Sequence, residues 1–327
     1  MTQPLLAIED VVVQVDRDGN MSNAVDGVTL AIESGSCLGL VGESGCGKSL
    51  TLKSIIGLLP RGSQAAGGRI SFSGKLEDED ISEGRTLRGR GVAMVFQEPM
   101  SALNPVMTVG DQIAEGLRQG GKVHGRRDSR KRVVELMDEV GIPNPQQRAD
   151  SWPHEMSGGM AQRVMIAMAL ATDPLLLLAD EPTTALDVTI QDQILGLLDD
   201  LRRDRNLSII LVSHDLAVVR QVADQVAVMY AGRVVEIGDA DQVLLHPQHP
   251  YTAGLLLSTP SLDYEGTRLR PIEGLPPPPD EYPKGCRFAP RCPHSLPKCA
   301  EAPYVLEEIM PGRATACIRW FELEVKT

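Results

Sequence analysis

The residues from Gly42 to Ser49 have the types and spacing that hold phosphate groups. They read Gly-Glu-Ser-Gly-Cys-Gly-Lys-Ser, follow an apolar segment and open a helical one, as a phosphate-binding loop requires. Glycines allow the backbone angles that turn several amides toward phosphate, where Lys48 adds a positive charge. Ser49 supplies an oxygen for Mg²⁺. The alternative is a glycine-rich turn that only joins a strand to a helix, and the placement of the motif favours phosphate binding.

Two carboxylates at the end of a later apolar segment have the chemistry of hydrolysis. Asp180 and Glu181 follow residues 175–179, and open α/β sheets bind ligands at the carboxyl ends of such strands. We expect Asp180 to lie in the outer shell of Mg²⁺ and Glu181 to deprotonate the attacking water. The alternative is that one acid caps the following helix. His214 ends another apolar segment, and we expect it to contact the γ-phosphate.

Short apolar segments alternate with helical ones and must position these side chains. Four segments have the pattern of buried strands, namely 37–41, 91–96, 175–179 and 209–212. Three have the pattern of helices, namely 48–59, 190–203 and 216–223. This order predicts an α/β fold with a parallel core sheet. A helical insertion is expected at about 98–170, including a helix over 129–140 with Ser129 as its N-cap.

Composition limits the class of protein. The 327 residues include 32 Lys plus Arg and 44 Asp plus Glu, for a net charge of −12. This length suits one large domain with an appendage or two domains, and the acidity argues against a nucleic-acid partner. No apolar run reaches the ~20 residues of a membrane-spanning helix, and the N-terminus does not resemble a secretory signal. We therefore expect a cytoplasmic chain without a membrane span.

Four of the six cysteines crowd into the last 42 residues, namely Cys286, Cys292, Cys299 and Cys317. A segment at 271–283 with six prolines precedes them and predicts a stiff, extended linker. The gaps of five, six and seventeen residues match neither a zinc ribbon nor the compact ferredoxin run. A cytosolic setting argues against disulfides. An iron–sulfur cluster, zinc and unligated thiols all stay open on spacing alone.

The segment Met156-Ser157-Gly158-Gly159-Met160-Ala161-Gln162-Arg163 resembles the signature of the ATP-binding subunits of ABC transporters. The resemblance implies that Ser157, Gly158 and Gly159 face ATP held by the opposite subunit, as a helix N-terminus binds anions. The alternative is that Ser157 is a simple N-cap. Met160 departs from the family, which most often has Gln there, and Val15 stands where many members stack an aromatic residue on adenine.

The same resemblance assigns further roles. It implies that Gln97 contacts Mg²⁺ and senses the membrane partner, and that Asp187 communicates across an ATPase dimer. Mg²⁺ is then held through Ser49, Gln97 and Asp180. We expect ATP to contact Gln97 together with nine consecutive residues, which are Gly42, Glu43, Ser44, Gly45, Cys46, Gly47, Lys48, Ser49 and Leu50.

Residues 153–155, Met160 and residues 246–252 resemble the dipeptide and oligopeptide importers within this family. The resemblance implies an ABC ATPase domain at 1–245, with additional β elements and a helical subdomain, and a C-terminal extension at 246–327. It implies ATP-driven peptide import at the cytoplasmic face of the cell membrane. The implied partners are a second ABC ATPase subunit in a heterodimer, two permease subunits and an extracytoplasmic substrate-binding protein.

Some members of this branch carry a [4Fe-4S] cluster in the extension. The resemblance therefore favours Cys286, Cys292, Cys299 and Cys317 as cluster ligands over zinc or free thiols. Other functions stay open: import of nickel or glutathione by the same machinery, a soluble ABC ATPase of repair or translation, and a redox-sensing regulatory subunit. The complete acidic pair and His214 argue that hydrolysis is retained.

Overall fold

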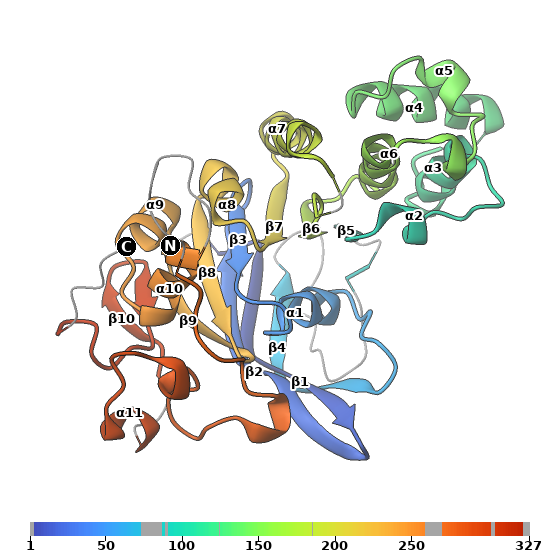
Figure 1. Ribbon diagram of the computed structural model, residues 1–327. Coiled ribbons are helices and arrows are strands. Elements are labelled where there is room, and N and C mark those ends of the chain that lie inside the picture. Colours follow the sequence, from blue (N-terminus) through green and yellow to red (C-terminus); the bar gives the residue numbers. More distant parts are fainter. Residues whose placement is uncertain are drawn as a thin grey trace.

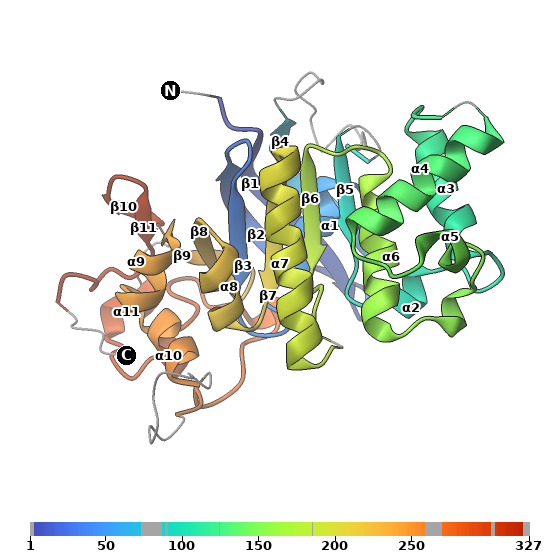
Figure 2. The same ribbon diagram turned by 90° about the horizontal axis from the view of Figure 1, so that it is seen from above.

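The central feature of the fold is a sheet whose middle strands run parallel (Figures 1 and 2). The computed structural model describes residues 3–72, 87–88, 91–123, 125–184, 186–258, 270–301 and 305–322. The strand order is β10-β11-β9-β8-β3-β7-β6-β5, and β8, β3, β7, β6 and β5 are mutually parallel. The strands are β3 (Cys37–Val41), β5 (Val92–Val95), β6 (Leu176–Asp180), β7 (Ser208–Ser213), β8 (Gln225–Tyr230), β9 (Arg233–Asp239), β10 (Glu307–Met310) and β11 (Arg313–Thr315). The predicted parallel core is confirmed.

Both faces of this sheet are covered, so every residue of β3, β6 and β7 is buried. Successive side chains of a strand point to opposite faces. Leu177 packs with Leu198 of α7 (Val188–Arg205), whereas Leu178 belongs to the core that contains Leu52 of α1 (Lys48–Ile55). Continuous apolar runs in the sequence reflect this two-sided burial.

A second, antiparallel sheet packs against the side of the central sheet that α1 covers. Its strands, in the order β2-β1-β4, are β1 (Leu6–Arg17), β2 (Asn20–Ile32) and β4 (Ser63–Phe72). Ile8 of β1, Leu40 of β3 and Leu52 of α1 share one buried core. This core fixes the loop between β3 and α1, which carries the phosphate motif.

The chain between β5 and β6 forms a helical lobe, seen at the right of Figure 1. Its helices are α2 (Pro99–Ala102), α3 (Val109–Gln119), α4 (Arg126–Glu139), α5 (Pro145–Arg148) and α6 (Gly158–Leu170). The prediction that Ser129 caps a helix is wrong. Helix α4 begins at Arg126 with Gly125 as its N-cap, and Ser129 is buried within it. The negative charge of Asp128 in the first turn stabilises the positive N-terminal end of the helix. This interaction favours a helix that begins before Ser129.

Helix α8 (Leu216–Val222) precedes β8, and described residues after β9 join the central sheet. Strand β11 pairs with β9 through Ala314 opposite Ile237 and Thr315 opposite Glu236, so the extension adds two strands to the central sheet. Helices α9 (Ala240–Leu245), α10 (Pro250–Ser258) and α11 (Pro297–Glu301) complete this part. Phe288 of the extension lies in the same buried core as Val41.

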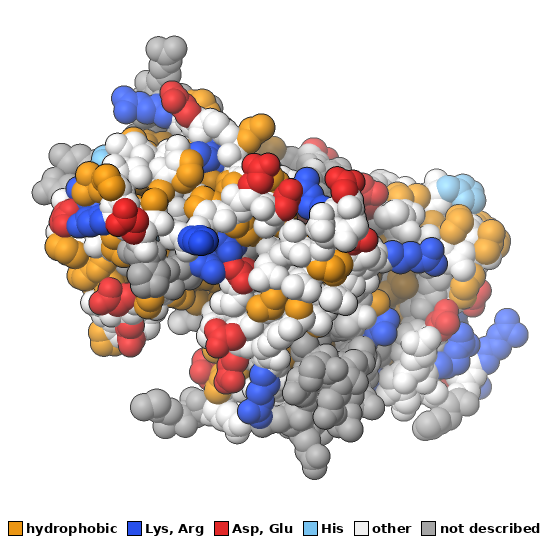
Figure 3. Space-filling view, turned by 90° about the horizontal axis from the view of Figure 1, so that it is seen from below, with side chains coloured by type: hydrophobic (Ala, Val, Ile, Leu, Met, Phe, Trp, Pro, Cys, Tyr) orange, Lys and Arg blue, Asp and Glu red, His pale blue; other side chains and the backbone are white. Residues whose placement is uncertain are grey.

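The surface shown in Figure 3 has Lys and Arg side chains interspersed with Asp and Glu. None of the helices in the described ranges is both long enough and apolar enough to cross a membrane.

Candidate active site

The loop between β3 and α1 has a backbone that only glycine adopts at two points. Gly42 has φ of 150° and Gly47 has φ of 108°. A Cβ atom on Gly42 would lie 2.2 Å from the carbonyl oxygen of Met229, a contact too short for any side chain. The loop is therefore pressed against β8 and turns sharply into α1.

Lys48, at the start of α1, lies across the inside of this loop. Its Nζ atom donates to the carbonyl oxygens of Gly42 and Glu43 at 2.8 and 2.9 Å. The first turn of α1 contains no acidic side chain. The helix N-terminus and the lysine thus present positive charge without a carboxylate of their own helix to compete with an anion.

Ser49 and Asp180 meet although they are far apart in the sequence. The Ser49 hydroxyl donates to Asp180 Oδ1 at 2.7 Å, at the carboxyl end of β6. Burial raises the pKa of Asp180, whose exposure is 4%. Two oxygen donors at this distance fit Mg²⁺, which prefers hard oxygen ligands. The expected convergence of these two side chains is present.

Glu181 is surrounded by polar side chains from three other positions in the chain. Its Oε2 atom accepts from Gln97 Nε2 at 3.0 Å and from Thr184 Oγ1 at 2.8 Å, and it lies 3.5 Å from His214 Nδ1. Glu181 itself has a left-handed φ of 48°, uncommon outside glycine. Two predicted residues, Gln97 and His214, thus converge on one oxygen of the predicted Glu181, and Thr184 is an orienting neighbour that sequence reasoning missed.

The signature residues lie apart from this cluster. Ser157 is the N-cap of α6 and accepts from the Met160 amide at 3.3 Å, as in the simple-cap interpretation. Asp187 caps α7 and accepts from the Ile190 amide at 3.0 Å. In the described part of the chain, no hydrogen bond or ion pair joins Ser157, Gly158 or Gly159 to the phosphate loop.

Val15 has a half-buried side chain on β1, where its backbone pairs with Ser22 and Ser63. Its aliphatic side chain offers no aromatic surface for stacking on a base. Val15 therefore cannot stack on adenine as the aromatic residue of many family members does.

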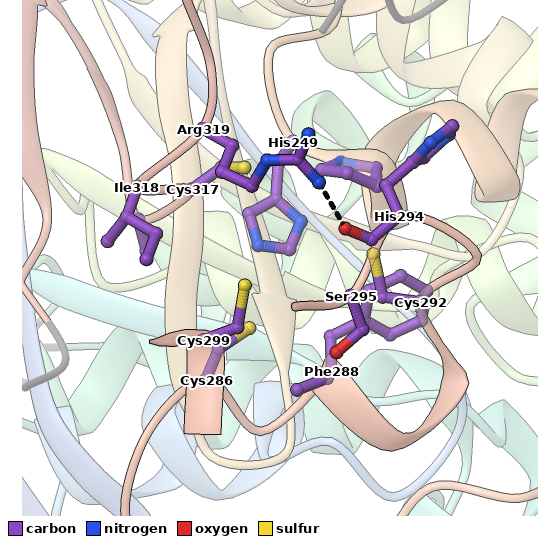
Figure 4. A pocket seen from close by; sticks show the side chains of 13 residues that line it. His249, Cys286, Phe288, Cys292, His294, Ser295, Cys299, Cys317, Ile318 and Arg319 are labelled. Atoms are coloured by element: carbon purple, nitrogen blue, oxygen red, sulfur yellow. Dashed lines mark hydrogen bonds between the residues drawn. The ribbon is translucent and has the colours of Figure 1, made fainter. Parts of the chain in front are cut away.

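The four late cysteines line one pocket, together with His249, His294, Phe288 and Arg319 (Figure 4). Cys286 and Cys299 are neighbours, because the Cys286 amide donates to the Cys299 carbonyl at 2.8 Å. Burial raises the pKa of the Cys286 and Cys292 thiols and raises that of Cys317 to about 11. The described residues nevertheless contain no group of three or more ligands already gathered around a metal position.

Comparisons with known proteins assign the family. A family model described as "ABC transporter" matches residues 25–184, and one described as "Oligopeptide/dipeptide transporter, C-terminal region" matches residues 235–299. A solved dimeric structure of the ATP-binding cassette MJ0796, bound to ADP and Pi, is 28% identical with a TM-score of 0.61, and the match covers 72% of this chain and 98% of that one.

Relatives match almost the whole chain. The dipeptide transport ATP-binding protein DppD of Bacillus subtilis (strain 168) is 48% identical over 316 residues, which cover 95% of this chain and 91% of DppD. The oligopeptide transport ATP-binding protein OppD of Escherichia coli (strain K12) is 45% identical over 320 residues, with 96% and 93% covered. This chain therefore belongs to the ABC transporter ATP-binding proteins of the dipeptide and oligopeptide transport family.

Proposed function

We propose that this chain is the ATP-hydrolysing subunit of an importer for dipeptides or oligopeptides. One observation supports this most strongly: Gln97, Thr184 and His214 converge on Glu181, beside the contact between Ser49 and Asp180. Relatives named for dipeptide and oligopeptide transport share 45 to 49% of its residues over most of its length.

The phosphate loop binds the nucleotide in this proposal. Amides of residues 42–50 face the phosphates, and Lys48 exchanges its contacts with the Gly42 and Glu43 carbonyls for phosphate oxygens. Ser49, Asp180 and Gln97 would hold Mg²⁺, and the metal would supply positive charge for the β- and γ-phosphates. The same cation would offset the cost of burying the Asp180 carboxylate, whose pKa is raised by burial.

Glu181 accepts the proton of the attacking water in this proposal. Gln97 and Thr184 fix one carboxylate oxygen, Oε2, by hydrogen bonds, and the other oxygen is then the one that accepts the proton. The His214 side chain is 61% exposed and contacts the γ-phosphate. Its contact with Glu181 holds the carboxylate in position relative to that phosphate. Placement of base and phosphate, more than covalent chemistry, carries the reaction.

A second ATPase subunit completes the site in this proposal. Ser157, Gly158 and Gly159 lie at an exposed helix N-terminus and, within the described ranges, form no hydrogen bond or ion pair with the phosphate loop of their own chain. We assign them to ATP held by the partner. Asp187 at the start of α7 communicates across that dimer. The pair acts at the cytoplasmic face of the membrane with two permease subunits and an extracytoplasmic substrate-binding protein.

Reconstitution tests the import function. The chain, its partner ATPase, the permease subunits and the substrate-binding protein in proteoliposomes are expected to accumulate labelled dipeptides or oligopeptides only with ATP and Mg²⁺. A matched assembly with Lys48→Ala is expected to show no ATP-dependent uptake. Accumulation of nickel or glutathione without peptide uptake would assign the other substrate class.

We also propose that Cys286, Cys292, Cys299 and Cys317 hold a [4Fe-4S] cluster. The donor set fits in type and number, because four thiols, three from loops and Cys299 from α11, line one pocket. The sulfur atoms would have to move to reach ligating positions, since no group is already gathered around a metal position in the described residues. Thiolate ligation would cross-link the proline-rich loops of the extension.

Metal analysis tests the cluster. Protein purified without oxygen from iron-replete cells is expected to be brown, with about four iron atoms per chain. Cys292→Ser is expected to lower the iron content and the visible absorption, whereas Cys37→Ala, a buried cysteine in β3, is expected to preserve both. Colourless protein with one bound zinc would favour zinc, and metal-free protein with four alkylated thiols would contradict both metals.

A further inference from the structure

Glu43, the second residue of the phosphate loop, forms an ion pair with a residue of the C-terminal extension. Arg291 Nη1 donates to Glu43 Oε2 at 2.6 Å, and Nη2 donates to Oε1 at 2.9 Å. The Arg291 side chain is 5% exposed and the Glu43 side chain is 25% exposed. A bidentate, charge-assisted contact with this little solvent is more closely fixed in geometry, and less screened by salt, than a surface ion pair.

Several other acceptors fix Arg291 in place. Its guanidinium also donates to the Tyr230 hydroxyl at 3.3 Å and to the backbone carbonyls of Ile272, Glu273 and Gly274 at 3.4, 3.0 and 3.2 Å. The five N–H groups of the planar guanidinium serve these acceptors, with the two of Nη2 shared among three, whereas the ammonium of a lysine has only three N–H groups. Arg291 is thus a rigid anchor from the extension to the phosphate loop.

A second residue of the extension holds the backbone of Glu43. The Glu43 amide donates to the Tyr251 hydroxyl at 2.8 Å. Tyr251 is fully buried. The centroid of its ring lies 4.5 Å from that of the Tyr230 ring and 5.3 Å from that of the Phe288 ring. Since the Glu43 carbonyl accepts from Lys48, the amide, carbonyl and side chain of this one residue all have partners. We call the contacts of Tyr251 and Arg291 with Glu43 the Glu43 clasp.

We infer that Tyr251 and Arg291 are positioning residues for ATP, which act by holding the phosphate loop in its binding shape. The inference rests on the proposed ATPase function. A loop with glycines at positions 42, 45 and 47 has high conformational entropy when unrestrained. The Glu43 clasp removes part of that freedom before ATP arrives, and preorganisation of this kind increases affinity.

The alternative is that the Arg291 contact only attaches the extension to the rest of the fold. A second ion pair allows positioning of the phosphate loop to be distinguished from attachment of the extension. Arg17 of β1 pairs with Asp280 of the extension at 2.7 Å, and both side chains are nearly half exposed. Among the described residues, neither side chain forms a hydrogen bond or ion pair with Glu43. Arg17→Met is therefore the matched control for Arg291→Met, because it also removes an arginine that bridges the two parts.

Titration with a fluorescent ATP analogue tests the clasp. Arg291→Met is expected to weaken binding about 10-fold, and in a Glu43→Gln background the same change is expected to alter affinity less than about twofold. Arg291→Lys is expected to restore only part of the affinity, and Tyr251→Phe to lose about threefold. In the assembled complex, KM for ATP is expected to rise with Arg291→Met while kcat stays within about twofold. Thermal unfolding identifies variants that fail to fold.

Three results would overturn the inference about the Glu43 clasp, and a fourth would contradict the proposed ATPase function. Unchanged ATP affinity in a folded Arg291→Met protein overturns the inference, as does an equal loss in Arg17→Met, which would mean that attachment alone matters. An undiminished effect of Arg291→Met in the Glu43→Gln background also overturns it, because Arg291 would then act by another route. Failure of the unaltered protein to bind the analogue would contradict the proposed ATPase function instead.

Discussion

Replacing Glu181 with glutamine is expected to lower ATP turnover by roughly 10²- to 10⁴-fold while ATP binding persists. Glutamine keeps the shape of the side chain, and its carbonyl oxygen still accepts from Gln97 and Thr184, as Glu181 Oε2 does at 3.0 and 2.8 Å. It cannot accept the proton of the attacking water. The variant is therefore expected to accumulate as a closed, ATP-bound dimer, measured by gel filtration with ATP and by phosphate release in the assembled complex.

Glu135→Gln is a suitable control for this experiment. Glu135 lies on α4 and pairs with Lys131 and Arg132 of its own helix. Its neutralisation is expected to change turnover by less than about twofold, because solvent-exposed pairs contribute little. Near-normal hydrolysis by the Glu181→Gln complex would show that another group is the principal base.

Replacing Gly158 with aspartate is expected to lower turnover of the assembled dimer by about 100-fold or more, through repulsion of phosphate held by the partner subunit. The chain itself has room for the side chain. Among the described residues, a Cβ atom on Gly158 meets Leu186 Cδ2 at 3.5 Å, an ordinary van der Waals contact, whereas one on Gly159 would lie 2.7 Å from Ile190 Cγ2. Gly158 is therefore the position where the trans contact can be tested without a clash inside the fold.

Two measurements distinguish the trans role from a structural one. ATP binding to the isolated Gly158→Asp chain is expected to stay within about twofold of normal, and Gly158→Ala, which adds volume without charge, is expected to retain much more turnover than the aspartate variant. If Gly158→Asp abolishes ATP binding by its own chain while hydrolysis at the partner's site stays normal, the assignment of the signature across the interface is wrong.

Local patterns in the sequence predicted much of the fold and several contacts of the site. Two-sided burial produces continuous apolar runs, so the segments at 37–41 and 209–212 were identifiable as central strands. Parallel strands bring their carboxyl ends to one edge, so Asp180 could be expected near Ser49. These inferences depend on the sequence immediately around each residue.

Contacts that depend on the path of the whole chain could not be predicted in this way. Strand β11 has three residues, too few for a periodic pattern, and it pairs with β9 because that edge is free to accept it. The contact of Arg291 with Glu43 joins residues 248 apart in the sequence, and a single arginine carries no signal of its partner. Residues 246–252 suggested a family, but the hydrogen bond from the Glu43 amide to Tyr251 emerges only in three dimensions.

The long separation of Glu43 from Arg291 in the sequence also limits when their contact can form during synthesis. The phosphate loop leaves the ribosome early, but Tyr251 and Arg291 are synthesised 208 and 248 residues later. Contacts across such long intervals form late, because the intervening chain must first fold. A nascent chain that ends before residue 291 therefore has a phosphate loop without the Arg291 contact of the Glu43 clasp.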